Sequence, residues 1–100
     1  MRFGDYHGHY ELNPFPGCSA IVVSNHAFIR PDCRGQGLGQ CQHRDRIEKA
    51  AELGYNMMIC TVRDDNRVEK HILDKNGWCF FTSFLNKETG HNIEIWGKHL

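Results

Sequence analysis

Apolar and polar residues follow one another along this chain at two different spacings, which predict strands and helices. Residues 20–29 are rich in apolar and β-branched side chains, and this predicts a buried strand. Pro31 then ends strand pairing, because proline has no N–H group to donate. Residues 38–53 are long enough for about four helical turns, and Gly54 can supply the left-handed conformation that commonly ends a helix. The first half of the chain therefore predicts a strand followed by a helix.

The second half of the chain repeats this order and then becomes strand-like. Residues 56–62 predict a second buried strand, and residues 66–76 predict a second helix. Residues 79–85 and 93–96 predict two antiparallel strands joined by a hairpin loop at 86–90. Because a single helix links the two buried strands, we expect them to lie parallel through a right-handed crossover.

Helical spacing also predicts which side chains face the core. In the first helix, the apolar stripe consists of Ile47, Ala50, Ala51 and Gly54, with His43 one turn earlier. In the second helix, the stripe consists of Val68, Ile72 and Leu73. The strand at 20–29 is apolar on both of its faces, which predicts helices covering both sides of the sheet.

The histidines of the N-terminal region allow two interpretations. Residues 1–10 mix glycine with aromatic residues and histidines, and we expect one strand there. His7 and His9 would lie on one face of such a strand as a candidate metal pair, and the alternative is a solvent-facing edge strand. Two prolines and a glycine at 13–17 predict a turn, because they interrupt strand pairing.

A glycine-rich segment, Arg34-Gly35-Gln36-Gly37-Leu38-Gly39, separates the first strand from the first helix. Backbone N–H groups at the start of a helix have no intrahelical partner, and the helix dipole favours a negative charge there. Glycines let a phosphate approach the backbone closely. The segment lacks the Gly-Lys-Ser/Thr ending of a P-loop, and Gln40 stands where the dinucleotide-binding fingerprint needs its third glycine. The spacing therefore predicts a pyrophosphate site of another kind.

The pattern Arg-x-x-Gly-x-Gly, preceded by Ile29-Arg30-Pro31, resembles the coenzyme A site of the GNAT superfamily of N-acetyltransferases. In that family the arginine-glycine loop holds the pyrophosphate of acetyl-CoA, and the end of the preceding strand pairs with the pantetheine arm. The resemblance implies the following cofactor-binding residues: Phe28, Ile29, Arg34, Gly35, Gln36, Gly37, Leu38, Gly39, Gln40 and Asn66.

The resemblance extends from about residue 20 to residue 78. Asn66 stands where family members often have a CoA-contacting asparagine, and Gly77-Trp78 replaces the usual Gly-Phe after the second helix. It implies an α+β (mixed α/β) fold: a mixed, mostly antiparallel sheet whose one parallel strand pair is joined by the cofactor-loop helix, with helices on both faces. We expect residues 1–100 to form a single GNAT-like domain whose N-terminal elements are shortened.

The resemblance implies an acetyl-CoA-dependent N-acetyltransferase acting on a small-molecule or peptide amine. Leu73 occupies the position of the family's usual tyrosine acid, and leucine cannot donate a proton. His26 is a candidate base, because it is the only residue of the strand at 20–29 with a suitable pKa. It interrupts the apolar pattern together with Ser24 and Asn25, and the alternative is a histidine satisfied within the core. Two other functions stay open: a CoA-binding or interaction module without catalysis, and a metal-binding protein.

Composition narrows the cellular setting and the partners. The formal net charge is zero, which argues against nucleic-acid and membrane partners. There is no apolar run near 18 residues, and we expect neither a transmembrane span nor a signal peptide. Five cysteines without a C-x-x-C pair favour a reducing cytoplasmic setting, and their spacing matches no common zinc site, so no metal is expected. We expect a homodimer through the C-terminal strands, where Phe81, Phe84 and Trp96 offer apolar area.

Overall fold

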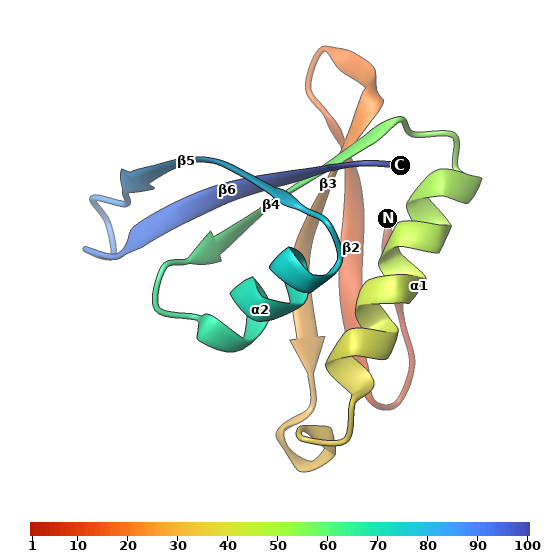
Figure 1. The fold of residues 1–100 in the computed structure, drawn as a ribbon. Helices are drawn as coiled ribbons and strands as arrows, with labels where there is room; N and C mark the ends of the chain where they lie inside the picture. The colour runs from red at the N-terminus through yellow and green to blue at the C-terminus, as the bar shows by residue number, and fades with distance from the viewer.

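The computed structural model describes all 100 residues except the side chain of His26. A six-stranded sheet has the strand order β1-β2-β3-β4-β6-β5, and two α-helices pack on it (Figure 1). The elements along the chain are β1 (Arg2–Gly4), β2 (Gly8–Phe15), β3 (Cys18–Ile29), the short 3-10 turn η1 (Pro31–Cys33), α1 (Leu38–Glu52), β4 (Met57–Arg63), α2 (Arg67–Lys75), β5 (Cys79–Leu85) and β6 (Asn92–His99).

The sheet has the predicted mixed topology. Only β3 and β4 run parallel, and α1 joins them, whereas the other neighbouring strands are antiparallel. The α+β fold class predicted from the sequence is therefore confirmed. Within the described residues, neither helix is long and apolar enough to cross a membrane.

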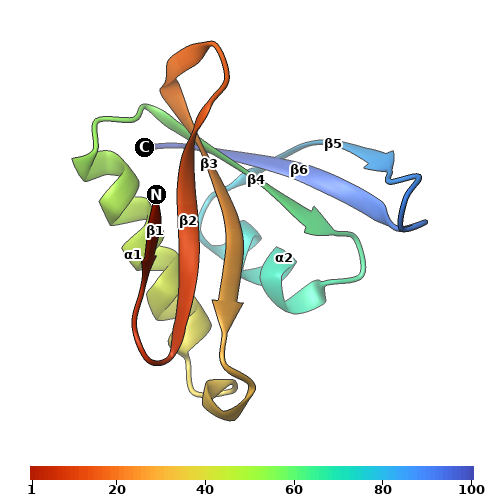
Figure 2. The same cartoon turned by 180° about the vertical axis from the view of Figure 1, so that it is seen from behind.

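Both helices lie on one face of the sheet, so the expected cover on both faces is wrong. Gln40 of α1 donates a hydrogen bond to Asn76 at the end of α2 (3.1 Å), which places the two helices side by side. Lys70 of α2 donates to Glu94 of β6 (2.9 Å), on the same face. The view from behind shows the strands in front of both helices (Figure 2). Apolar side chains on the second face of β3 thus mark a face that these helices leave uncovered.

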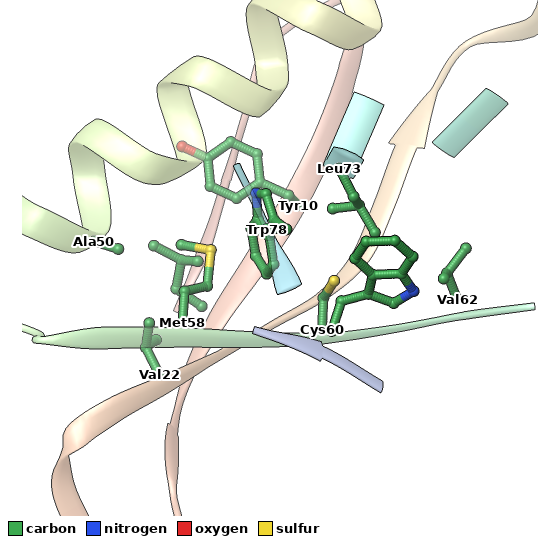
Figure 3. Close-up of a cluster of buried hydrophobic side chains, with 10 residues drawn as sticks. Tyr10, Val22, Ala50, Met58, Cys60, Val62, Leu73 and Trp78 are labelled. Atoms are coloured by element: carbon green, nitrogen blue, oxygen red, sulfur yellow. The ribbon is translucent and has the colours of Figure 1, made fainter. Parts of the chain in front are cut away.

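The core fills the space between the helices and the covered face of the sheet (Figure 3). Leu73, Met58 and Val22 are fully buried there. The buried apolar cluster consists of Tyr10, Leu12, Val22, Ala50, Met58, Cys60, Val62, Leu73, Trp78 and Trp96. Burial raises the pKa of the Cys60 thiol to about 12, as expected of a cysteine that serves as apolar filler.

The predicted helix stripes are only partly correct. In α1 the buried residues are His43, Arg46 and Ala50, whereas Ala51 is exposed. Arg46 takes an inward position because it lies three residues after His43 and four before Ala50, on the same helical face. In α2 Leu73 is buried as predicted, but Val68 is 74% exposed.

Two predictions for the N-terminal region are also wrong. The region forms two strands, and His7 lies in the bend between them, so His7 and His9 do not share a strand face. The His9 ring instead stacks on Phe28 with centroids 5.3 Å apart. The expected turn at 13–17 begins later, because β2 continues through Pro14 to Phe15. Proline is tolerated there because β1 pairs only with residues as far as Glu11, so Pro14 lies on an edge of the sheet.

The parallel strands separate after a short contact. Pairing between β3 and β4 is limited to Ile21–Met57, Val22–Met58 and Val23–Ile59, although both strands continue for several more residues. Beyond Val23 the strands diverge, and Figure 1 shows β4 running away from β3 toward α2. This divergence opens a wedge in the middle of the sheet.

Candidate functional site

A groove of about 690 Å³ lies where the wedge meets the glycine-rich loop. The end of β3, the loop, the first turns of α1 and the start of α2 form its walls. The residues that line it are Ala27, Phe28, Ile29, Arg34, Gly35, Gly37, Gly39, Gln40, Gln42, Arg46, Asn66, Val68, Glu69 and Ile72. The fold therefore places the loop and Asn66, which are far apart in sequence, around one groove.

The structure brings most of the predicted cofactor residues together, but not all of them. Phe28, Ile29, Arg34, Gly35, Gly37, Gly39, Gln40 and Asn66 line the groove. Gln36 does not line it, and Leu38 instead lines a separate cavity of about 310 Å³ beneath the β1–β2 turn. Consecutive residues of a turn point in different directions, so a motif that names every residue of the loop includes some that face away.

The loop is shaped by two glycines in the left-handed region. Gly35 has φ 79° and Gly37 has φ 77°, a conformation in which other residues are strained. Gly37 is also the N-cap of α1, and among the described side chains none accepts a hydrogen bond from the first N–H groups of that helix. Those N–H groups are therefore available to an anion, and the helix dipole favours one.

Arg34 and Gln42 connect the loop and α1 to the end of β3. The Arg34 Nε donates to the Ile29 carbonyl (3.0 Å), and its guanidinium lies 5.6 Å from the Phe28 ring centre. Gln42 Nε2 lies 3.2 Å from both the Phe28 and the His9 carbonyl oxygens. The Arg34 side chain is exposed, so its terminal nitrogens add positive charge at the mouth of the groove.

Asn66 has a structural task besides its place in the groove. Its Oδ1 accepts a hydrogen bond from the Glu69 N–H (3.2 Å) and so caps the N-terminus of α2. The amide nitrogen Nδ2 still carries two donors. Asn66 can therefore cap the helix with one atom and bind a ligand oxygen with the other.

A second cavity of about 260 Å³ lies in the wedge, between the separated ends of β3 and β4. It shares four lining residues with the groove: Ala27, Arg46, Asn66 and Glu69. Its other lining residues are Ser24, Asn25, Cys60, Thr61, Val62 and Arg63. A ligand in the groove and a ligand in this cavity would therefore meet at Arg46 and Glu69.

A buried polar cluster forms this shared wall. Arg46 is 3% exposed and donates to Ser24 Oγ (3.1 Å) and to Glu69 Oε1 (3.3 Å). Its NH2 also lies 2.9 Å from His43 Nδ1. Sequence reasoning missed Arg46 and Glu69, because an arginine and a glutamate in a helix are most often solvent-exposed. The available signal was the helical spacing of Arg46 relative to His43 and Ala50.

The residues considered for proton transfer are placed as follows. The side chain of His26 lies outside the described residues. Leu73 is fully buried in the core, and its hydrocarbon side chain provides no proton donor at the position matched to the family's tyrosine acid. Among the described residues, no group of three or more histidine, cysteine or acidic side chains could hold a metal ion.

Comparison with known proteins identifies the fold through solved structures. No protein-family model and no curated protein matches the sequence. An IAA acetyltransferase from Bacillus cereus is 14% identical with a TM-score of 0.85, covering 98% of this chain and 73% of that one. A GNAT family acetyltransferase from Elizabethkingia anophelis with acetyl-CoA bound is 16% identical with a TM-score of 0.84, covering 96% and 70%.

A third similar structure is a ribosomal-protein-alanine N-acetyltransferase from Brucella melitensis, 18% identical with a TM-score of 0.83. The match covers 94% of this chain but only 62% of that enzyme, so the chain spans less than two thirds of its length. The shared part comprises the mixed sheet, the parallel strand pair and the two helices described above. The chain therefore has the fold of the GNAT acetyltransferases.

Proposed function

We propose that this protein is an acetyl-CoA-dependent N-acetyltransferase that acts on a small-molecule or peptide amine. The observation that supports this most strongly is the groove, which joins an uncapped helix N-terminus to the wedge between β3 and β4. Structures with the same fold contain acetyl-CoA or CoA. Bound acetyl-CoA would supply an acetyl group activated as a thioester.

The residues of the groove divide naturally between the parts of such a ligand. The N–H groups that follow Gly35 and Gly37, together with the Arg34 guanidinium, would hold the pyrophosphate. Phe28 and Ile29 at the end of β3 would align the pantetheine arm, and Asn66 Nδ2 would donate to one of its oxygens. Positioning of this kind converts a bimolecular reaction into an effectively unimolecular one.

Substitution of Gly39 tests the binding site directly. Gly39 is helical, and an added Cβ would meet only Ile72 Cδ1 at 3.7 Å, so a side chain fits there without backbone strain. Gly39→Leu should project into the groove and abolish acetyl-CoA binding measured by calorimetry, whereas Gly39→Ala should bind nearly as wild type. Circular dichroism should show both variants folded. Undiminished binding by a folded Gly39→Leu variant would rule out the groove as the cofactor site.

Catalysis without a tyrosine acid should be slow. General acid catalysis typically contributes about 10²–10⁴-fold, so its absence lowers turnover without preventing release of the thiolate to water. With His26 as the base, the acetylation rate should rise with pH through about 6–7, and His26→Ala should flatten that rise. Mass spectrometry after incubation with a panel of amines and peptides measures the product.

The presence of a leucine at position 73, where the resemblance would place a proton donor, favours one alternative, a CoA-binding module that has lost catalysis. This alternative predicts tight CoA binding and no acetylation of any amine in the panel. Acetylation that is unchanged in His26→Ala would keep the enzyme and exclude His26 as its base.

The protein's setting and assembly are also part of the proposal. All five cysteines are unpaired, which supports a reducing, cytoplasmic location. A homodimer would cover Phe81 and Phe84, each 48% exposed on the edge strand β5, whereas Trp96 belongs to the core and is only 8% exposed. Sedimentation should give a dimer that Phe84→Asp dissociates, and a monomeric wild type at high micromolar concentration would exclude it.

A further inference from the structure

The guanidinium of Arg46 is almost completely removed from water, yet it has fewer hydrogen-bond acceptors around it than donors. Its Nε is buried and has no hydrogen-bond partner among the described residues. The group carries five N–H donors, and its firm acceptors are Ser24 Oγ and Glu69 Oε1. The contact to Glu69, at 3.3 Å, is longer than the 2.7–2.9 Å usual for a charge-assisted hydrogen bond.

His43, the third neighbour of Arg46, does not supply the missing hydrogen-bond acceptor. His43 has N–H donors facing both of its ring nitrogens: Arg46 NH2 lies 2.9 Å from Nδ1, and Trp78 Nε1 lies 3.0 Å from Nε2. A neutral imidazole can accept at only one nitrogen. His43 is neutral near pH 7, because burial lowers its pKa to about 4. His43 therefore cannot accept from both the Trp78 indole and Arg46 NH2, and neither of its ring nitrogens faces the unpartnered Arg46 Nε.

The unsatisfied cation lines the small cavity between β3 and β4, beside one carboxylate. Glu69 Oε1 is held by Arg46, and its Oε2 has no hydrogen-bond partner among the described side chains. The cavity is thus lined by an arginine that is short of acceptors and by a glutamate with a free carboxylate oxygen. The two side chains are adjacent, because Arg46 NH2 lies 3.3 Å from Glu69 Oε1. Ser24 and Thr61 supply hydroxyl groups to the same space, which holds about 260 Å³.

We propose that this cavity binds the acceptor, and that the acceptor is a small amino acid whose carboxylate contacts Arg46 and whose amine contacts Glu69. This inference rests on the proposed function for its chemistry, because it places the amine at the wall shared with the acetyl-CoA groove. A zwitterion matches the two charges that the cavity presents, and its carboxylate supplies a further acceptor to a guanidinium that is short of acceptors. A simple amine would supply no such acceptor.

The experiment compares amino acids with their amides, which differ mainly in the charge of the carboxyl group. Calorimetry of protein saturated with CoA should show glycine, alanine or serine binding about 10- to 100-fold more tightly than its amide, because hydrogen bonds between charged groups are the strong ones. Arg46→Leu should remove this preference, and Glu69→Gln should weaken binding of both members of a pair. Arg44→Leu, an exposed arginine on the same helix, is the matched control and should keep the preference.

The outcomes separate this inference from the proposed function. A failure to bind CoA contradicts the proposed function, and the same amino-acid titration without CoA still tests the cavity. Equal binding of acid and amide, no binding of either, or a preference that survives in a folded Arg46→Leu variant overturns the acceptor assignment. A thermal melt establishes that the variants are folded, and Arg46→Gln serves as a second variant that keeps hydrogen-bonding groups without the charge.

Discussion

Met57 and Met58 are neighbours in β4, but they lie in opposite surroundings. Met58 is fully buried between the sheet and the two helices, whereas Met57 is half-buried on the face that the helices leave uncovered. The same contrast holds for the whole sheet: the covered face carries the core, the groove and the Arg46 cluster. The comparison shows that the helices α1 and α2 complete one face of the sheet and create the site on that face.

The uncovered face is also apolar. Its side chains come from four strands and are half-buried or exposed: Ile21, Val23, Met57, Ile59, Phe81, Phe84, Ile93 and Ile95. Gly97 shows how closely they pack, because a Cβ added there would lie 2.5 Å from the Phe81 ring. A face of this kind is typical of a surface that another protein segment covers.

Substituting the two methionines should give the largest difference in stability. Met58→Ala should lower the free energy of unfolding by about 2–5 kcal/mol, because it leaves a cavity in the core. Met57→Ala should cost much less, because its side chain already contacts water. Urea unfolding of both variants at low protein concentration measures the difference.

The same pair of variants also tests the proposed homodimer. A dimer that covers the uncovered face would bury Met57. Met57→Ala should therefore be more destabilising at high protein concentration, where the dimer forms, because the stability of a dimer depends on concentration. Equal losses for both variants at every concentration would contradict the contrast between the two faces.

On the covered face, His43 should make stability depend on pH. Its pKa is about 4 in the folded protein, against 6.5 for the ordinary side chain. As pH falls below about 6.5, the unfolded chain takes up a proton that the folded protein does not, so folding is weakened. The loss should reach about 3 kcal/mol at pH 4 and be absent above pH 7.

Unfolding free energies measured between pH 7 and pH 4.5 check this expectation before most carboxylates titrate. His43→Gln retains hydrogen-bonding groups but cannot titrate, so it should flatten the slope over that interval. A slope that is the same in wild type and His43→Gln would assign the pH dependence to other groups.

The sequence predicted the elements that local physical chemistry determines. The β-branched run of β3, the glycines before α1 and the spacing of Asn66 from β4 predicted the strand, the loop and the start of α2. These features depend on neighbours in sequence, so a single chain reveals them. The parallel pairing of β3 and β4 followed from the single helix between them.

The remaining features depend on contacts between distant segments. Arg46 is buried because Ser24 of β3 and Glu69 of α2 meet it, and neither partner can be recognised from the sequence of α1. Pro14 continues a strand because β1 ends before reaching it. An apolar face likewise does not reveal whether a helix of the same chain covers it, which is why the prediction of helices on both faces was wrong.

The smallest expected effect separates the two tasks of Asn66 on the covered face. Asn66→Asp keeps an oxygen that can accept from the Glu69 N–H, so the cap and the stability of α2 should remain close to wild type. It removes the Nδ2 donors and adds a negative charge, so acetyl-CoA should bind more weakly. Asn66→Ala removes both atoms and should cost about 1 kcal/mol of stability as well as affinity. Thermal melts and calorimetry on the same samples distinguish the cases, and Asn66→Asp with wild-type affinity would restrict Asn66 to capping α2.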